Sequence, residues 1–174
     1  MLVKYNLIVD SYLRNPQYWQ SYKNFKKDGA IVTAIYDNPG ALGLIFKTNK
    51  PLKGDVNYTL SIYVKGTNSF QLNYNYFMDK ENGNYSLNYS SLEYPPHAWQ
   101  RITIPFKHNE NRSYEKIMVG FNRFVSGNME LSFKYPKLEE GTESTIYTPN
   151  PEEFDKERQE IFPPEGEYRE IKAI

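Results

Sequence analysis

The sequence predicts an all-β protein, an antiparallel β-sandwich of about eight to nine strands. Short runs in which apolar and polar residues alternate fill residues 30–138, and Gly, Asn and Pro turns separate them. No apolar stripe of helix length interrupts these runs, so an α/β fold is disfavoured. The chain has 174 residues, which is enough for one well-buried core.

The alternation is clearest in Asn57–Lys65, where Tyr58, Leu60, Ile62 and Val64 would face one side. Pro16–Lys27 shows no such pattern and is predicted to be a loop or a short helix. In chain order, the other predicted strands are an edge strand at Tyr5–Val9, then Ala30–Tyr36, Leu42–Lys47, Ser69–Phe77, a run through Tyr85, Leu87 and Tyr89, Trp99–Lys107, Lys116–Phe124 and Met129–Leu138.

Two of these strands carry specific predictions about the core. Ser69–Phe77 is interpreted as one continuous strand whose core side holds Phe70, Leu72, Tyr74 and Tyr76. Met129–Leu138 is interpreted in the same way, and Trp99 is predicted to be a core residue at the start of its strand. The core side of Met129–Leu138 would hold Met129, Leu131, Phe133 and Tyr135.

The pattern changes after Tyr147, where a short helix is predicted. A helix start is indicated by an N-cap, a first-turn proline and the acid of a capping box: Asn150, Pro151 and Glu153. A thin stripe at helical spacing follows and would dock on the sandwich or on a partner: Phe154, Arg158 and Ile161. We therefore divide the chain into a sandwich domain, residues 1–148, and a C-terminal connector, residues 149–174.

The charge of the chain supports this division. The formal net charge is zero, but residues 149–174 hold eight acids and four bases, which leaves thirteen acids and seventeen bases for residues 1–148. The connector is therefore acidic and the sandwich mildly basic. Two interpretations stay open, a solvated linker and a tail that docks on a neighbouring subunit.

Several functional classes find no support in the sequence. A neutral chain does not favour broad nucleic-acid binding, and there is no Cys for disulfides or thiolate chemistry. No signal peptide or membrane-spanning segment is recognisable, so no membrane insertion is expected. His97 and His108 lie in turn-like segments without a partnered nucleophile or metal spacing. We do not expect an enzyme.

Four segments carry a family resemblance: Asn6–Ser11 followed by Trp19, Tyr58–Gly66, Trp99–Thr103, and Lys137–Gly141 followed by Thr148–Glu152. They resemble the carbohydrate-binding-module-like (galactose-binding-like) jelly rolls of glycoside-hydrolase accessory domains and of phage tail and baseplate proteins. Ile146 and Tyr147 stand where that family usually has Asp and Trp, and Glu153 stands where it usually has Asp. The resemblance spans residues 6–152 and implies a jelly-roll β-sandwich.

The resemblance also implies where ligands would bind. Such jelly rolls often bind a saccharide on one face of a sheet, through amides, hydroxyls and an aromatic ring. The alternative is an ordinary solvated face, and for Trp19 packing against the sandwich. The candidate saccharide residues are Tyr63, Gln71, Asn73, Asn75, Ser86, Asn88 and Trp19. Many modules of the family hold a structural Ca²⁺, for which Asp10 and Glu139 are the candidates by position; no other cofactor is expected.

The function that the resemblance implies is that of a non-enzymatic phage virion component in a tail, baseplate or fibre. Its partners would be other tail or fibre proteins, further copies of itself in a symmetric assembly, and host cell-wall polysaccharide. The chain would be made in the host cytoplasm and released in the particle. Two alternatives stay open: a structural virion spacer without sugar binding, and an accessory carbohydrate-binding module of a bacterial glycoside hydrolase system.

Overall fold

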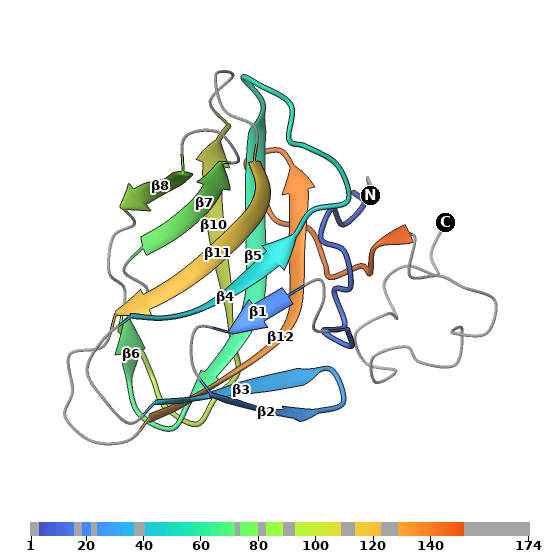
Figure 1. Cartoon of the computed structure of the whole chain (residues 1–174). Coiled ribbons are helices and arrows are strands. Elements are labelled where there is room, and N and C mark those ends of the chain that lie inside the picture. Colours follow the sequence, from blue (N-terminus) through green and yellow to red (C-terminus); the bar gives the residue numbers. More distant parts are fainter. Residues whose placement is uncertain are drawn as a thin grey trace.

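The protein is built almost entirely of β-strands. The computed structural model describes residues 4–15, 19–21, 24–36, 41–71, 74–79, 83–88, 93–108, 114–122 and 129–151. Within these residues there are twelve strands and no α-helix, and ten of the strands form two five-stranded antiparallel sheets. The predicted all-β sandwich is therefore confirmed. Figure 1 shows the sheets stacked, with β8, β7, β11, β4 and β1 in front of β10, β5 and β12.

Each sheet takes its strands from distant parts of the chain. Sheet I has the order β1-β4-β11-β7-β8, with the bounds Trp19–Ser21, Ala41–Lys47, Tyr114–Asn122, Tyr74–Asp79 and Gly83–Asn88. Sheet II has the order β10-β5-β12-β3-β2, with the bounds Gln100–Lys107, Asn57–Gly66, Met129–Glu140, Ile31–Tyr36 and Phe25–Asp28. A two-stranded pair, β6 (Phe70–Gln71) and β9 (Glu93–Tyr94), completes the described structure.

The core lies between the two sheets and follows the predicted alternation of β5. Leu60, Ile62 and Val64 are fully buried, and their counterparts from sheet I include Leu44 and Phe46. Each such side chain contributes about 1.5–3 kcal/mol through burial. The apolar alternation of the central strands is therefore what holds the sheets together.

One core residue carries a titratable group. Tyr58 is 1% exposed, its ring stacks on that of Phe106 at 5.8 Å, and its hydroxyl accepts a 2.8 Å hydrogen bond from the Lys53 amide. Burial raises the pKa of Tyr58 above the ordinary value of 10.0, although the hydrogen bond from Lys53 opposes this. The neutral phenol is therefore favoured in the folded state.

This shift predicts a loss of stability at high pH. The contribution of Tyr58 is fully present below its unfolded pKa of 10.0 and is lost as the pH rises through the higher folded value. Urea denaturation from about pH 8 to about pH 11 should show a steeper fall in unfolding free energy for the wild type than for Tyr58→Phe. Equal slopes for the two proteins would contradict the assignment, because the other tyrosines are common to both.

A β-bulge divides β12 into two parts, and it changes which alternate residues of the strand face the core. The pairing with β5 shifts between Lys134 and Lys137, and Tyr135 there adopts a φ of 52°. Before the bulge, Phe133 points into the core; after it, Leu138 does. Tyr135 consequently lies outside the main core, so the prediction that it continues the core side of this strand was wrong. A period-2 pattern cannot reveal a bulge, because a bulge breaks the period.

Other elements also differ from the sequence prediction. Tyr5–Val9 forms one isolated bridge, Ile8 to Thr48, rather than a strand. Pro16–Lys27 contains β1 and the start of β2, which pairs with β3 across a turn where Gly29 has a φ of 55°. All of β2 is exposed, so its strand state comes from that pairing and not from an apolar pattern of its own. Trp99 is partly exposed just before β10 and is not a core residue.

Candidate functional site

The two sides of sheet I are identified by the residues that belong to the main core. Leu44, Phe46 and Ile117 are fully buried and belong to the main core. Because successive strand residues alternate, Ile45 belongs to the opposite, outer face; it is absent from the main core cluster but is only 6% exposed, so this face is covered at the Ile45 position. The pairing register then assigns every residue aligned with Ile45 to the outer face of sheet I as well.

Two neighbouring rows on this outer face combine tyrosines with small polar residues. One row aligns Gly43, Gly120, Tyr74 and Asn88, and the next aligns Ile45, Met118, Tyr76 and Ser86. The two glycines leave bare backbone beside the Tyr74 position. Aromatic rings for C–H faces, with amides and hydroxyls for hydroxyl groups, are the groups that bind saccharides. The outer face of sheet I is therefore a candidate saccharide-binding surface.

The predicted saccharide residues do not share this surface. Ser86 and Asn88 belong to it, but Asn75 aligns with Val119 and Leu44, on the core side. Within the predicted strand Ser69–Phe77, β6 pairs with β9 while β7 joins sheet I, so the alternation does not run through. The two faces of β7 are therefore the reverse of the prediction. Tyr74 and Tyr76 belong to the outer face, where Asn75 was expected, and Asn75 belongs to the core side.

The remaining predicted saccharide residues lie elsewhere. Tyr63 is in β5 of sheet II, the other sheet of the sandwich, and Gln71 is in the separate strand β6. Asn73 lies outside the described residues. Trp19, on the edge strand β1, aligns with Phe46, the register position expected for packing against the sandwich.

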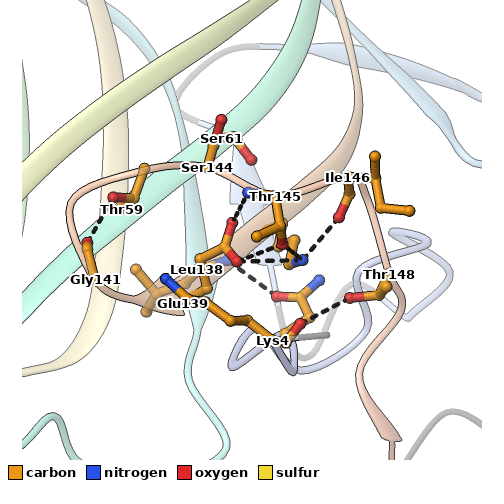
Figure 2. A network of polar contacts seen from close by, with 12 residues as sticks. Lys4, Thr59, Ser61, Leu138, Glu139, Gly141, Ser144, Thr145, Ile146 and Thr148 are labelled. Atoms are coloured by element: carbon orange, nitrogen blue, oxygen red, sulfur yellow. Dashed lines mark hydrogen bonds and ion pairs between the residues drawn. The ribbon is translucent and has the colours of Figure 1, made fainter. Parts of the chain in front are cut away.

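A polar network holds the segment after β12 against sheet II (Figure 2). Lys137 and Glu139 are both fully buried, and their side chains form an ion pair at 3.4 Å. The Lys137 ammonium donates to the Thr145 hydroxyl at 2.6 Å and to the Ile146 carbonyl at 2.7 Å. Glu139 accepts from both the amide and the hydroxyl of Thr145, at 2.7 and 2.6 Å. Burial lowers the pKa of Lys137, and the neighbouring Glu139 carboxylate opposes that shift.

The same segment covers the outer face of sheet II at Thr59 and Ser61. Gly141 makes the turn after β12 with a φ of 118°, which favours glycine, and its carbonyl accepts from Thr59 at 2.7 Å. Arg101 donates to the Thr145 carbonyl and to the Ser61 hydroxyl. Thr59 and Ser61 are consequently buried, although they face away from the core.

Asn6 joins the N-terminal segment to this network. Its amide nitrogen donates to the Pro136 carbonyl at 2.8 Å, and its amide oxygen accepts from the backbone of Ile8 and of Leu138, each at 3.0 Å. Asn6 has no exposed surface. One side chain therefore satisfies three buried backbone groups, two of them about 130 residues away in the chain.

The two calcium candidates are engaged within the protein. Asp10 has a φ of 55° and accepts hydrogen bonds from the backbone amides of Arg14 and Asn15. Glu139 is bonded to Lys137 and Thr145, as described above. Among the residues that the structure describes, no group of three or more His, Cys, Asp or Glu could hold a metal ion. The predicted Ca²⁺ stays a prediction, and at Glu139 an ammonium supplies the positive charge.

A cluster of tyrosines packs beside the bulge of β12. The ring centroids of Tyr135 and Tyr147 lie 4.8 Å apart, and Tyr12 contacts both at 6.1 Å. The Tyr147 hydroxyl is hydrogen-bonded to that of Ser11 at 2.8 Å. The tyrosine that stands where the family usually has Trp therefore packs the C-terminal segment onto the N-terminal one.

The residues proposed for docking, Phe154, Arg158 and Ile161, lie outside the described residues, as does the predicted helix. The division at residue 148 likewise stays a prediction. Asn150 is fully buried, and its side chain donates to the Ile8 carbonyl at 3.1 Å. The described chain up to Asn150 is thus attached to the sandwich.

The polar network was missed in the sequence, although its signal is present. Lys137 and Glu139 are two residues apart in a strand, and residues at that spacing share a face. An opposite-charge pair at this spacing, followed by Gly141 and a Thr-rich segment, indicates an ion pair covered by a returning loop. Asn6 had no comparable signal, because its partners follow it by 130 and 132 residues.

Comparison with known proteins identifies the fold. No family model and no curated protein matches the chain. A CBM4 carbohydrate-binding module matches with a TM-score of 0.56 and 10% identity over 73% of this chain and 97% of the module. The CBM22 and GH10 modules of a Clostridium thermocellum endo-1,4-β-D-xylanase, complexed with xylohexaose, match with a TM-score of 0.56 and 16% identity. This match covers 79% of this chain and 29% of the xylanase chain. The tripod from the baseplate of bacteriophage Tuc2009 matches with a TM-score of 0.60 and 20% identity. This match covers 87% of this chain and 60% of the tripod chain.

The protein thus has the β-sandwich fold of carbohydrate-binding modules, as the sequence resemblance predicted. A phage baseplate protein shares this fold. The chain spans less than two thirds of the matched xylanase and baseplate chains. No helix among the described residues is long and apolar enough to cross a membrane.

Proposed function

We propose that this chain is a non-catalytic saccharide-binding component of a phage tail, baseplate or fibre that attaches the particle to host cell-wall polysaccharide. The observation that carries the proposal is the outer face of sheet I. One row there aligns Tyr74 with Asn88 beside a glycine pair, and the next row aligns Tyr76 with Ser86. The similarity to the Tuc2009 baseplate tripod supports the virion context, since it covers 87% of this chain.

Such a module acts through repetition in the particle. A face with two tyrosines would provide weak binding per site, and several copies in a symmetric assembly would raise the overall avidity. The partners of the module would then be other tail proteins, further copies of this chain and the host polysaccharide. The acidic segment 149–174 would connect the module to its neighbours.

The saccharide site is tested by a substitution at the centre of the proposed face. Tyr76→Ala should weaken binding to a glycan array and to purified host cell-wall polysaccharide about 10-fold, because the aromatic surface for a sugar ring is lost. The matched control is Tyr5→Ala, since Tyr5 is 69% exposed and lies outside both sheets. Equal binding by Tyr76→Ala and wild type would refute this face as the site.

A second candidate is an accessory module of a glycoside hydrolase system. It is favoured by the xylanase match, in which the similar region belongs to a chain with CBM22 and GH10 modules. The two candidates differ in genome context, because one predicts neighbouring tail genes and the other a neighbouring hydrolase gene. A chain encoded among tail genes whose assembled particle adsorbs normally with Tyr76→Ala would instead be a structural spacer.

A further inference from the structure

The outer face of sheet II is covered only in part. The part that holds Thr59 and Ser61 lies under residues 141–147 and is buried. A second part begins at Tyr63, two residues further along β5, where the side chains become partly exposed. This second part lies on the opposite side of the sandwich from the tyrosine rows of sheet I.

Cations and aromatic rings alternate on this partly exposed part of the face. The residues form a patch, called the cationic-aromatic patch below, that spans β12, β5 and β10: Tyr63, Lys65, Trp99, Arg101 and Lys134. Tyr63 is paired with both Arg101 and Lys134 in the sheet register. The Lys134 ammonium lies 4.8 Å from the centre of the Trp99 ring and 5.6 Å from that of Tyr63, and the Lys65 ammonium lies 5.1 Å from Trp99. Two ammonium groups therefore meet at one tryptophan.

The patch carries unbalanced positive charge. Among the described residues, several other surface lysines each pair with an acid: Lys26 with Glu130, Lys53 with Glu140 and Lys107 with Asp55. Lys65 and Lys134 contact rings instead and form no ion pair in that part of the chain. Cation–π contacts hold an ammonium in place but leave its charge uncompensated, so the ammonium can still bind an anion.

We propose that the cationic-aromatic patch is a second ligand site and binds an anionic saccharide, one that carries carboxylate or phosphate groups. Lys65 and Lys134 would hold the anionic group, and the partly exposed edges of Trp99 and Tyr63 would contact the sugar ring. The combination favours a saccharide over an acidic peptide, which needs the charges but not the two rings. The site is separate from the face proposed above, and neither depends on the other.

The test measures binding of the full chain to polygalacturonate and to a poly(glycerol phosphate), with neutral xylan as the reference. Binding of one or both polyanions is expected to weaken at least about 10-fold in the double variant Lys65→Gln/Lys134→Gln and to decline with added salt. The two polymers distinguish carboxylate from phosphate recognition. Lys50→Gln/Lys107→Gln removes the same charge from exposed lysines outside the patch and should bind within about 2-fold of wild type.

Two results would overturn the proposal. In the first, neither polyanion binds to the wild-type chain. In the second, the two double variants weaken binding equally, which would show attraction by net charge alone. Retained polyanion binding by Tyr76→Ala separates this site from the face of sheet I, and each variant's melting temperature verifies that it is folded.

Discussion

Replacing Lys137 with Met should lower the free energy of unfolding by about 3–5 kcal/mol. Lys137 is fully buried, and its ammonium provides the positive charge beside the equally buried Glu139 carboxylate at 3.4 Å. Met fills a similar volume, so the loss would come mainly from the uncompensated charge and from the Ile146 carbonyl, which loses its donor. Equilibrium urea denaturation measures the change.

A second substitution should restore much of this stability. In Lys137→Met/Glu139→Gln the buried charge is absent, and the Gln side-chain oxygen can still accept from the Thr145 amide, which now bonds to Glu139 at 2.7 Å. The matched control is Lys53→Met, which breaks the exposed pair with Glu140 and should cost only about 0–1 kcal/mol. A loss of similar size for Lys53→Met and Lys137→Met would argue against a special role for the buried pair.

The same pair bears on the predicted calcium ion. We propose that Lys137 balances the charge of Glu139, so a chelator should leave the melting temperature of the wild-type protein unchanged. A fall in melting temperature on chelation, reversed by Ca²⁺, would show that a calcium site contributes to stability instead.

Asn6→Ala should cost at least about 3 kcal/mol, because it leaves three buried backbone groups without their partner. These are the Pro136 carbonyl and the amides of Ile8 and Leu138. Denaturation of Asn57→Ala provides the control, since Asn57 is exposed at the start of β5 and should change stability by no more than about 0.5 kcal/mol. A change of that small size for Asn6→Ala would mean that water or a rearranged backbone replaces the side chain.

The sandwich could be predicted because apolar and polar residues alternate in its central strands, and because Gly, Asn and Pro residues mark the turns between strands. In β5, four apolar residues at alternate positions predicted the side that faces the core. The failures occur where the period changes. The bulge at Tyr135 and the break between β6 and β7 each shift the alternation, and a local pattern cannot anticipate either.

The candidate sites could be predicted only in part, because they combine strands that are distant in the chain. Tyr63 was grouped with Asn75, although the two lie on different sheets, since nothing in the sequence states which strands pair. Trp99 was assigned to the core as the residue that begins its strand, whereas the lysines that contact it come from β5 and β12. The buried ion pair within Lys137–Gly141 becomes evident only once residues 141–147 are seen to return over it.

The attachment of both described chain ends to β12 and its neighbours has a mechanical consequence. Leu7 donates to the Leu138 carbonyl, Thr148 to the Lys4 carbonyl and Asn150 to the Ile8 carbonyl, so the two ends are cross-linked at one corner of the sandwich (Figure 1). A pull on the chain beyond residue 151 would first load these bonds and the hydrogen bonds of Thr145 and Ile146 with Lys137 and Glu139, because they hold residues 145–150 on the sandwich. This corner would therefore bear such a load before the rest of either sheet.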